Sequence, residues 1–103
     1  MAEAILVKCG FSNTSTLLFQ NVQVQVSYWK EDTTYVDYPF KAEIPCEGIT
    51  ENHVPEVIFS LTDANSGQFA PICNTSAGFV YIWAYELPQD IIEIPLIRAT
   101  LLV

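Results

Sequence analysis

Residues 79 to 103 read FVYIWAYELPQDIIEIPLIRATLLV and contain two apolar segments separated by a polar break at residues 87–90. Successive side chains of a β-strand point to opposite faces of its sheet. One face of the first segment is then aromatic (Phe79, Tyr81, Trp83, Tyr85) and the other is aliphatic (Val80, Ile82, Ala84). Because both faces are apolar, we expect protein to cover both. The stretch is therefore predicted to lie in the middle of a sandwich, a barrel or a subunit interface.

The end of this stretch stays apolar to its last residue. Chain ends are usually polar and loosely held, so an apolar end indicates burial, here against a neighbouring subunit. Together with the aromatic face, it predicts a subunit interface. The residues of this predicted interface are Phe79, Tyr81, Trp83, Tyr85, Leu101, Leu102 and Val103.

Upstream, short segments alternate apolar and polar residues with the period of a strand. The clearest is VQVQVSYW at residues 22–29, which predicts a strand with one buried and one solvated face. Similar patterns predict strands at residues 4–9, 40–44, 57–61 and 69–73, the last at a sheet edge because Pro71 lacks an amide hydrogen. Residues 47–53 are predicted to be a polar loop. The TDANSG segment at residues 62–67 predicts a tight hairpin turn, since Asn and Gly accept positive φ.

These segments predict the fold class and the domain organisation. With 103 residues, half of them hydrophobic, the chain has enough apolar surface for one core. Short strands at regular spacing, with no sustained helical periodicity, predict an all-β, single-domain β-sandwich or jelly-roll-like fold of about seven to eight strands, which we expect to be oligomeric. Residues 1–28 form either an attachment segment or the first strands of the same sandwich.

The charge balance limits the partners. Four Lys and Arg stand against twelve Asp and Glu, for a formal net charge of −8. Nucleic acids and anionic membranes require clustered positive charge, so we expect no nucleic acid and no membrane insertion. The N-terminus, MAEAILVKCG, has Glu3 where a signal peptide has its basic region. We therefore expect the protein to be made in a cytoplasm and not to be secreted by a signal peptide.

The cysteines, Cys9, Cys46 and Cys73, are odd in number and have no CxxC spacing. They read most simply as three buried thiols in a reducing compartment. One disulfide with one remaining thiol is an alternative, and so is a zinc site that joins Cys46 and His53 to another cysteine. No ligand pair has the spacing of a zinc finger, so no metal and no cofactor are expected.

The sequence contains no recognisable pattern of catalytic residues. Its one histidine, His53, falls in the polar segment before Pro55, where we expect it to be solvated. No base is placed beside a nucleophilic Ser or Cys, the carboxylates lack the D-x-D-x-D spacing of a calcium loop, and the glycines stand alone. The sequence therefore predicts a protein that is not an enzyme and has no catalytic residues.

Three aromatic residues, Trp29, Tyr35 and Tyr38, surround the charged segment at residues 30–34. Exposed Trp and Tyr beside carboxylates are typical of surfaces that bind sugars or proteins. The alternative is that these rings cap the open end of the core.

The order of landmarks between residues 29 and 97 resembles a known small β domain. The landmarks are Trp29 and the segments 34–39 (TYVDYP), 42–44 (AEI), 48–50 (GIT), 55–59 (PEVIF), 63–67 (DANSG), 69–71 (FAP), 78–82 (GFVYI) and 94–97 (IPLI). The domain recurs in tailed phages and prophages of Firmicutes and gut bacteria, alone or at the C-terminal end of virion appendage proteins described as tail, baseplate or fibre components.

The resemblance implies a non-enzymatic virion protein: a subunit of a fibre, of a tail-tip or baseplate, or of a capsid decoration. It also implies a homotrimer that docks on other virion proteins and presents loops outward, with adhesion to a glycan or protein of the host surface as a further role. Two alternatives remain. One is a small acidic phage-encoded inhibitor of a host defence protein, which the net charge of −8 suits. The other is a monomeric carbohydrate-binding module.

Overall fold

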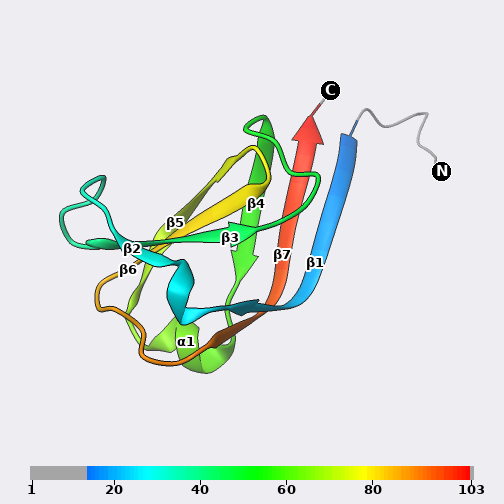
Figure 1. The fold of residues 1–103 in the computed structure, drawn as a ribbon. Coiled ribbons are helices and arrows are strands. Elements are labelled where there is room, and N and C mark those ends of the chain that lie inside the picture. The colour runs from blue at the N-terminus through cyan, green and yellow to red at the C-terminus, as the bar shows by residue number, and fades with distance from the viewer. Residues whose placement is uncertain (1–13, 103) are drawn as a thin grey trace.

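The computed structural model describes residues 14–102, which form seven strands, one short α-helix and one 3-10 helix (Figure 1). The elements are β1 (Thr14–Val24), the 3-10 helix η1 (Val26–Tyr28), β2 (Trp29–Glu31), β3 (Phe40–Pro45), β4 (His53–Ile58), α1 (Leu61–Asn65), β5 (Phe69–Ser76), β6 (Phe79–Ala84) and β7 (Ile92–Leu102). The prediction of a single all-β, sandwich-like domain is confirmed.

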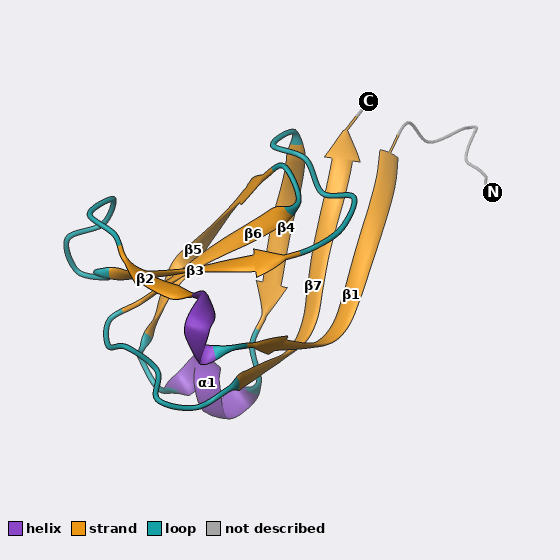
Figure 2. Cartoon of the chain, in the orientation of Figure 1, coloured by secondary structure: helices purple, strands orange, loops and turns teal. Residues whose placement is uncertain are grey.

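The strands form two antiparallel sheets, one in the order β1-β7-β4 and the other in the order β2-β3-β6-β5. Figure 2 shows the three-stranded sheet on the right, with β3 and β6 of the four-stranded sheet running across it. The two apolar segments of residues 79–103 thus form β6 and β7, each an inner strand of a different sheet. Of the three predicted places, a sandwich, a barrel or a subunit interface, the structure shows the sandwich.

The core lies between the two sheets and is built from the inward side chains of both. From β3 and β6 it receives Ala42, Ile44, Val80 and Ile82, and from β7 it receives Ile94, Ile97 and Ala99. All of these side chains are buried. One face of the four-stranded sheet therefore lies on the core, formed by the apolar positions of the alternating strand β3 and by the aliphatic side of β6.

β1 and β7 both bend at one point, where their inward faces change phase. Ile94 and Ile97 are both fully buried although they lie three positions apart, which a regular two-residue alternation does not allow. On β1, Phe19 pairs with Ile97 and Val22 with Ile94, and Asn21 between them has a φ of 53°. Asn tolerates this left-handed conformation better than most residues. The straight part of β1 therefore ends at Gln20.

Two local predictions are corrected. The alternating segment at residues 22–29 is not one strand, because β1 ends at Val24 and η1 turns the chain before β2. The segment at residues 62–67 is not a hairpin turn, because it joins strands of different sheets through α1. Ser60 begins this helix by accepting a hydrogen bond from the Asp63 amide on its hydroxyl. Gly67, with a φ of 75°, follows its end.

Other local predictions stand or shift. β3 confirms the strand predicted at residues 40–44, and β5, with Pro71, is an edge strand as predicted. The strand predicted at residues 57–61 lies earlier, at His53–Ile58. The strand predicted at residues 4–9 lies outside the described residues. Within the described part of the chain, no helix has the length and apolar character needed to cross a membrane.

Candidate interaction surfaces

The outer face of the four-stranded sheet is partly covered by the loop of residues 32–39, which joins β2 to β3. The carboxylate of Asp32 holds this loop, because Oδ2 accepts hydrogen bonds from the Trp83 indole Nε1 (2.9 Å) and from the Thr34 amide (3.0 Å). At the other end of the loop, the Asp32 amide donates to the carbonyl of Pro39 (2.8 Å). Above Trp83 the Tyr35 ring packs edge-on, with 4.9 Å between ring centroids.

These contacts perturb the acidity of Asp32. Its pKa falls from the ordinary 3.8 to about 2, chiefly because the Trp83 indole and then Thr34 donate hydrogen bonds to the ionised carboxylate. The Lys41 ammonium, 3.6 Å from Oδ1, contributes less, and desolvation acts in the opposite direction. Asp32 is therefore ionised at neutral pH and holds Trp83 as a structural contact.

The predicted subunit interface is consequently divided. Trp83 is only 3% exposed, which corrects the expectation that a neighbouring subunit covers it: the chain's own loop does. Tyr81 is half-buried beneath the Lys41 ammonium, 4.6 Å from its ring centroid, whereas Phe79 and Tyr85 are exposed. Leu101 is half-buried. The side chain of Leu102 and the whole of Val103 lie outside the described residues.

The three aromatic residues predicted to bind at the surface do not form one surface. Trp29 is 6% exposed and packs in the core beside Phe69, with ring centroids 6.2 Å apart, which corrects the expectation that it is exposed. Tyr35 lies on Trp83 and Tyr38 is half-buried. The alternative of rings that cap the core agrees with the position of Trp29.

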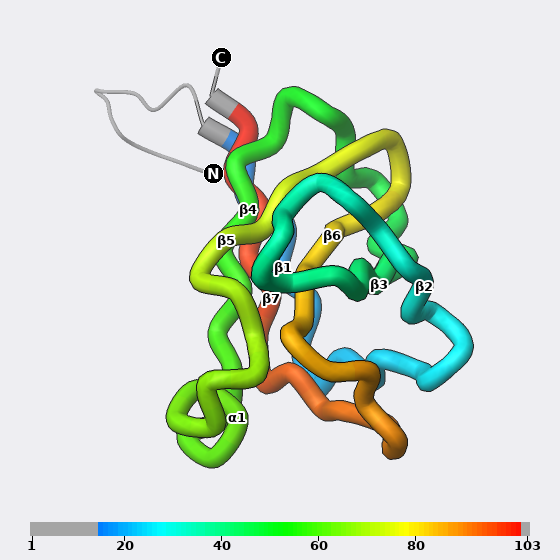
Figure 3. The backbone as a smooth tube through the Cα atoms, turned by 90° about the vertical axis from the view of Figure 1, so that its left-hand side faces the viewer, coloured from blue at the N-terminus to red at the C-terminus, as the bar shows by residue number. Residues whose placement is uncertain are grey.

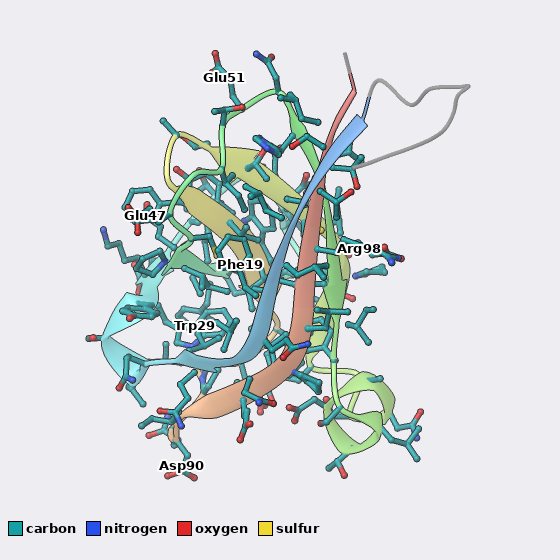
Figure 4. The ribbon with its side chains drawn as sticks, turned by 90° about the vertical axis from the view of Figure 1, so that its right-hand side faces the viewer. Phe19, Trp29, Glu47, Glu51, Asp90 and Arg98 are labelled. Carbon is teal, nitrogen blue, oxygen red and sulfur yellow. The ribbon has the colours of Figure 1, made fainter. Side chains whose placement is uncertain are left out.

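The outer face of the three-stranded sheet is different, since no described segment covers its aliphatic side chains. Leu18 of β1 is 57% exposed, and Val54 and Ile58 of β4 are 56% and 41% exposed. Between them Arg98 of β7 pairs with Glu56, its Nε donating to Oε1 at 2.8 Å. Figure 4 shows Phe19 and Arg98 on opposite sides of this sheet. The face thus combines exposed aliphatic groups with one ion pair.

The outer edge of this sheet is β1, and its composition sets it apart from the other edge strands. Its eleven residues, TSTLLFQNVQV, include no charged residue and no proline. β4 contains Pro55 and Glu56, β5 contains Pro71 and an irregular register, and β2 is three residues long with two charges. Charges, prolines, irregularities and short length are the features that keep sheet edges from pairing with other chains. β1 has no charged residue and no proline, and it is long.

A groove lies along β4 and β5, edge strands of the two sheets, and α1 contributes to its wall. Figure 3 shows the backbones of these three elements on one side of the molecule. The volume of the groove is about 390 Å³, and its walls include the stacked rings of Phe59 and Phe69, 4.8 Å apart. Cys73 closes one side, its thiol donating to the Pro55 carbonyl at 3.7 Å. Burial raises the pKa of this thiol. The groove is apolar and holds no cluster of groups suited to a reaction.

His53 lies at the start of β4 and is buried, which corrects its predicted place in a solvated loop. Its Nδ1 accepts a hydrogen bond from the Thr50 amide (2.9 Å) and lies 3.0 Å from the Thr50 hydroxyl. Because Nδ1 is an acceptor, the proton of the neutral ring sits on Nε2. The hydrogen bond from Thr50 and the burial of the ring thus indicate a structural role for His53.

Among residues 14–102, the cysteine thiols are not arranged for reaction, and the side chains that could bind a metal do not form a cluster. Burial raises the pKa of the Cys46 thiol to about 11, so it is protonated and a poor nucleophile at neutral pH. Cys46 and Cys73 are both reduced, and Cys9 lies outside the described residues. No three His, Cys, Asp or Glu side chains come together there as a metal site would require.

The described cations are all neutralised by carboxylates. Lys30 contacts Glu43 at 3.2 Å, Lys41 contacts Asp32 and Glu43, and Arg98 contacts Glu56. Eight described carboxylates have no such ion pair: Glu31, Asp37, Glu47, Glu51, Asp63, Glu86, Asp90 and Glu93. The net negative charge is therefore carried by the surface. Figure 4 places Glu47 and Glu51 toward one end of the molecule and Asp90 toward the other.

Two features here escape the sequence patterns used above: the exposed face of the three-stranded sheet and the Asp32 contact with Trp83. The edge strand does have a sequence signal, the absence of any charge over residues 14–24. Comparison with known proteins gives no further guide, because no protein-family model, no curated protein and no solved structure matches the chain.

Proposed function

We propose that this protein is a non-enzymatic virion structural protein, a subunit of a phage fibre, tail-tip, baseplate or capsid decoration that acts by assembling with other copies and with other virion proteins. The observation that carries the proposal is the exposed aliphatic face of the three-stranded sheet beside the uncharged edge strand β1. Exposed apolar surface next to an open sheet edge is typical of a contact with other protein.

The place of this assembly in a virion rests on the resemblance of residues 29–97 to phage appendage domains. Adhesion to the host surface extends the same proposal, with loops such as residues 32–39 presented outward. Phe79 and Tyr85 are exposed on or next to β6 and offer a second contact area for a trimer or for another virion protein.

Two measurements test the proposal. Light scattering of the full chain at micromolar concentration is expected to give the mass of a homo-oligomer, and a monomer would contradict self-assembly. Mass spectrometry of purified particles from an induced host is expected to detect the polypeptide in the virion. Its presence in the lysate but not in the particles would contradict a virion role.

A second candidate is a small acidic inhibitor of a host defence protein. The specific observation in its favour is that the described Lys and Arg residues are all neutralised, which leaves eight carboxylates to face a basic partner. Recovery of a nucleic-acid enzyme with the protein from host lysate, reversed by salt, would favour this function. The carbohydrate-binding alternative has less support, since Trp29 is buried.

A further inference from the structure

We infer that the edge of β1 is a self-pairing site: two copies join their β1 strands antiparallel about a two-fold axis, so that two three-stranded sheets become one continuous sheet. The inference rests on the proposed function, because it names the partner and the surface through which an assembly subunit would associate. It starts from the edge strand and from the outer side chains that β1 carries.

β1 is the longest edge strand among the described residues. One side of β1 is paired with β7 along its length, while on its other side no described strand lies. An open edge presents unpaired amide and carbonyl groups that another strand can satisfy. The straight part of β1, residues 14–20, is long enough for such a ladder, and the bend at Asn21 ends it.

Charge does not oppose a second copy at this edge. A chain with a net charge of −8 repels its own copies wherever carboxylates face each other. β1 contributes no charge at all, and its neighbour on the outer face is the paired Arg98. Antiparallel pairing of β1 with itself therefore brings together two edges that carry no charged residue. The edge strand β5 is uncharged as well, but Pro71 and a register shift interrupt it.

The side chains of β1 indicate the register in which the two β1 strands pair. With Leu18 opposite its own counterpart, Leu17 faces Phe19 on the inner side, and Thr16 faces Gln20 on the outer side. Leu17 and Phe19 then form apolar pairs on the inner face, Thr16 and Gln20 form polar pairs on the outer face, and the 57% exposed Leu18 side chain is buried against its counterpart at the axis. Centring the pair on Leu17 would instead place Leu18 opposite Thr16. The geometry thus assigns Leu18 to the two-fold axis.

Analytical ultracentrifugation of the full chain over a concentration series tests the inference. We expect the wild type to form a dimer and Leu18→Lys to raise the dissociation constant at least tenfold, because two ammonium groups would meet at the axis. Leu61→Lys is the matched control, since Leu61 is 78% exposed on α1, away from the β1 edge, and should leave the dimer intact. Circular dichroism verifies that each variant is folded.

A mixture tests the register. Leu18→Glu alone is also expected to be monomeric, whereas equimolar Leu18→Lys and Leu18→Glu should recover a dimer through opposite charges at the axis. Failure of the mixture to associate would overturn the assignment of Leu18 to the axis. Hydrogen exchange of the wild type gives an independent readout. The alternate amides of residues 15–19 that point away from β7 should gain protection as the concentration increases, whereas those that point to β7 should not change.

The other outcomes separate this inference from the proposed function. A dimer that persists in Leu18→Lys would overturn pairing through β1 while leaving self-assembly in place. A trimer would overturn the two-fold pairing and favour the β6 side. A monomer whose outward-pointing β1 amides are protected at every dilution would assign the edge to residues 1–13 of the same chain and overturn the inference. A monomer without such protection would contradict both proposals.

Discussion

The two outer faces of the sandwich differ in what covers them. On the four-stranded sheet, the loop of residues 32–39 returns over β6, with Asp32 bound to Trp83 and Tyr35 packed on the same ring. On the three-stranded sheet, Leu18, Val54 and Ile58 remain exposed around the Arg98–Glu56 pair. The chain's own loop covers Trp83 in the middle of the aromatic face and leaves Phe79 and Tyr85 exposed at its ends, whereas no described loop covers the aliphatic face.

This difference shows that hydrophobic residues alone do not mark an interaction surface. The aromatic face of β6 is the more apolar in sequence, yet its largest ring is buried within the chain. The aliphatic face is less apolar in sequence, yet more of it is exposed. Coverage by the chain's own loops is thus what separates a structural face from a candidate interface.

The largest expected effect concerns the core that both faces share. Ile82 in β6 and Ile97 in β7 are buried at equivalent depth in opposite sheets. Each Ile→Ala substitution should lower the free energy of unfolding by about 2 to 5 kcal/mol. Urea denaturation followed by fluorescence and circular dichroism should show one shared transition for both variants. A separate early transition in Ile97→Ala alone would mean that the three-stranded sheet unfolds on its own.

A smaller effect is expected at the contact that covers the four-stranded sheet. Asp32→Ala removes the acceptor of the Trp83 indole and of the Thr34 amide, and should lower the unfolding free energy by about 1 to 3 kcal/mol. Quenching of tryptophan fluorescence by acrylamide should increase as the loop leaves Trp83. Asp37→Ala, in the same loop but without an ion pair among the described residues, is the control and should change neither measurement.

The same contact predicts a pH dependence. The pKa of Asp32 in the folded chain is about 2, below the ordinary 3.8, so folding stabilises the ionised carboxylate. This contribution is fully present above about pH 4 and is lost as the pH falls toward 2, with a magnitude on the order of 1 kcal/mol. Asp32→Asn keeps an oxygen acceptor but does not titrate. The stability difference between wild type and Asp32→Asn should therefore shrink between pH 5 and pH 2, and a constant difference would contradict the assigned cause.

The sequence predicted the two inner strands of the four-stranded sheet and failed where the chain turns. Residues 40–44 alternate apolar and polar side chains, whereas residues 79–84 form one apolar run, and each strand places one face on the core. Residues 22–29 also alternate apolar and polar side chains, but this alternation does not predict the 3-10 helix that interrupts the segment. A period-2 pattern reports which side chains can share a face, and it does not report whether the backbone continues straight.

The candidate surfaces were harder to predict, because coverage is a tertiary property. His53 looks solvated in sequence, yet the Thr50 amide satisfies Nδ1 and allows the ring to be buried. Trp83 looks available to a partner, yet Asp32, 51 residues away in the chain, holds its indole. Neither pairing follows from local spacing. The absence of charge over residues 14–24 is visible in the sequence, but neither the strand over residues 14–21 nor its position at an edge was predicted.

The smallest expected change in the free energy of unfolding is at the exposed aliphatic face. This measurement directly tests whether that face is uncovered in the single chain. Val54 is exposed on the outer side of β4, whereas Val80 is fully buried in β6. Val→Thr replaces a methyl group by a hydroxyl of similar size. At Val54 the hydroxyl meets water, so the unfolding free energy of the dilute chain should change by less than about 0.5 kcal/mol. At Val80 the hydroxyl lacks water, and the loss should be about 1 to 3 kcal/mol. Equal losses at the two positions would mean that the aliphatic face is already covered in a single chain, and the contrast with the aromatic face would then disappear.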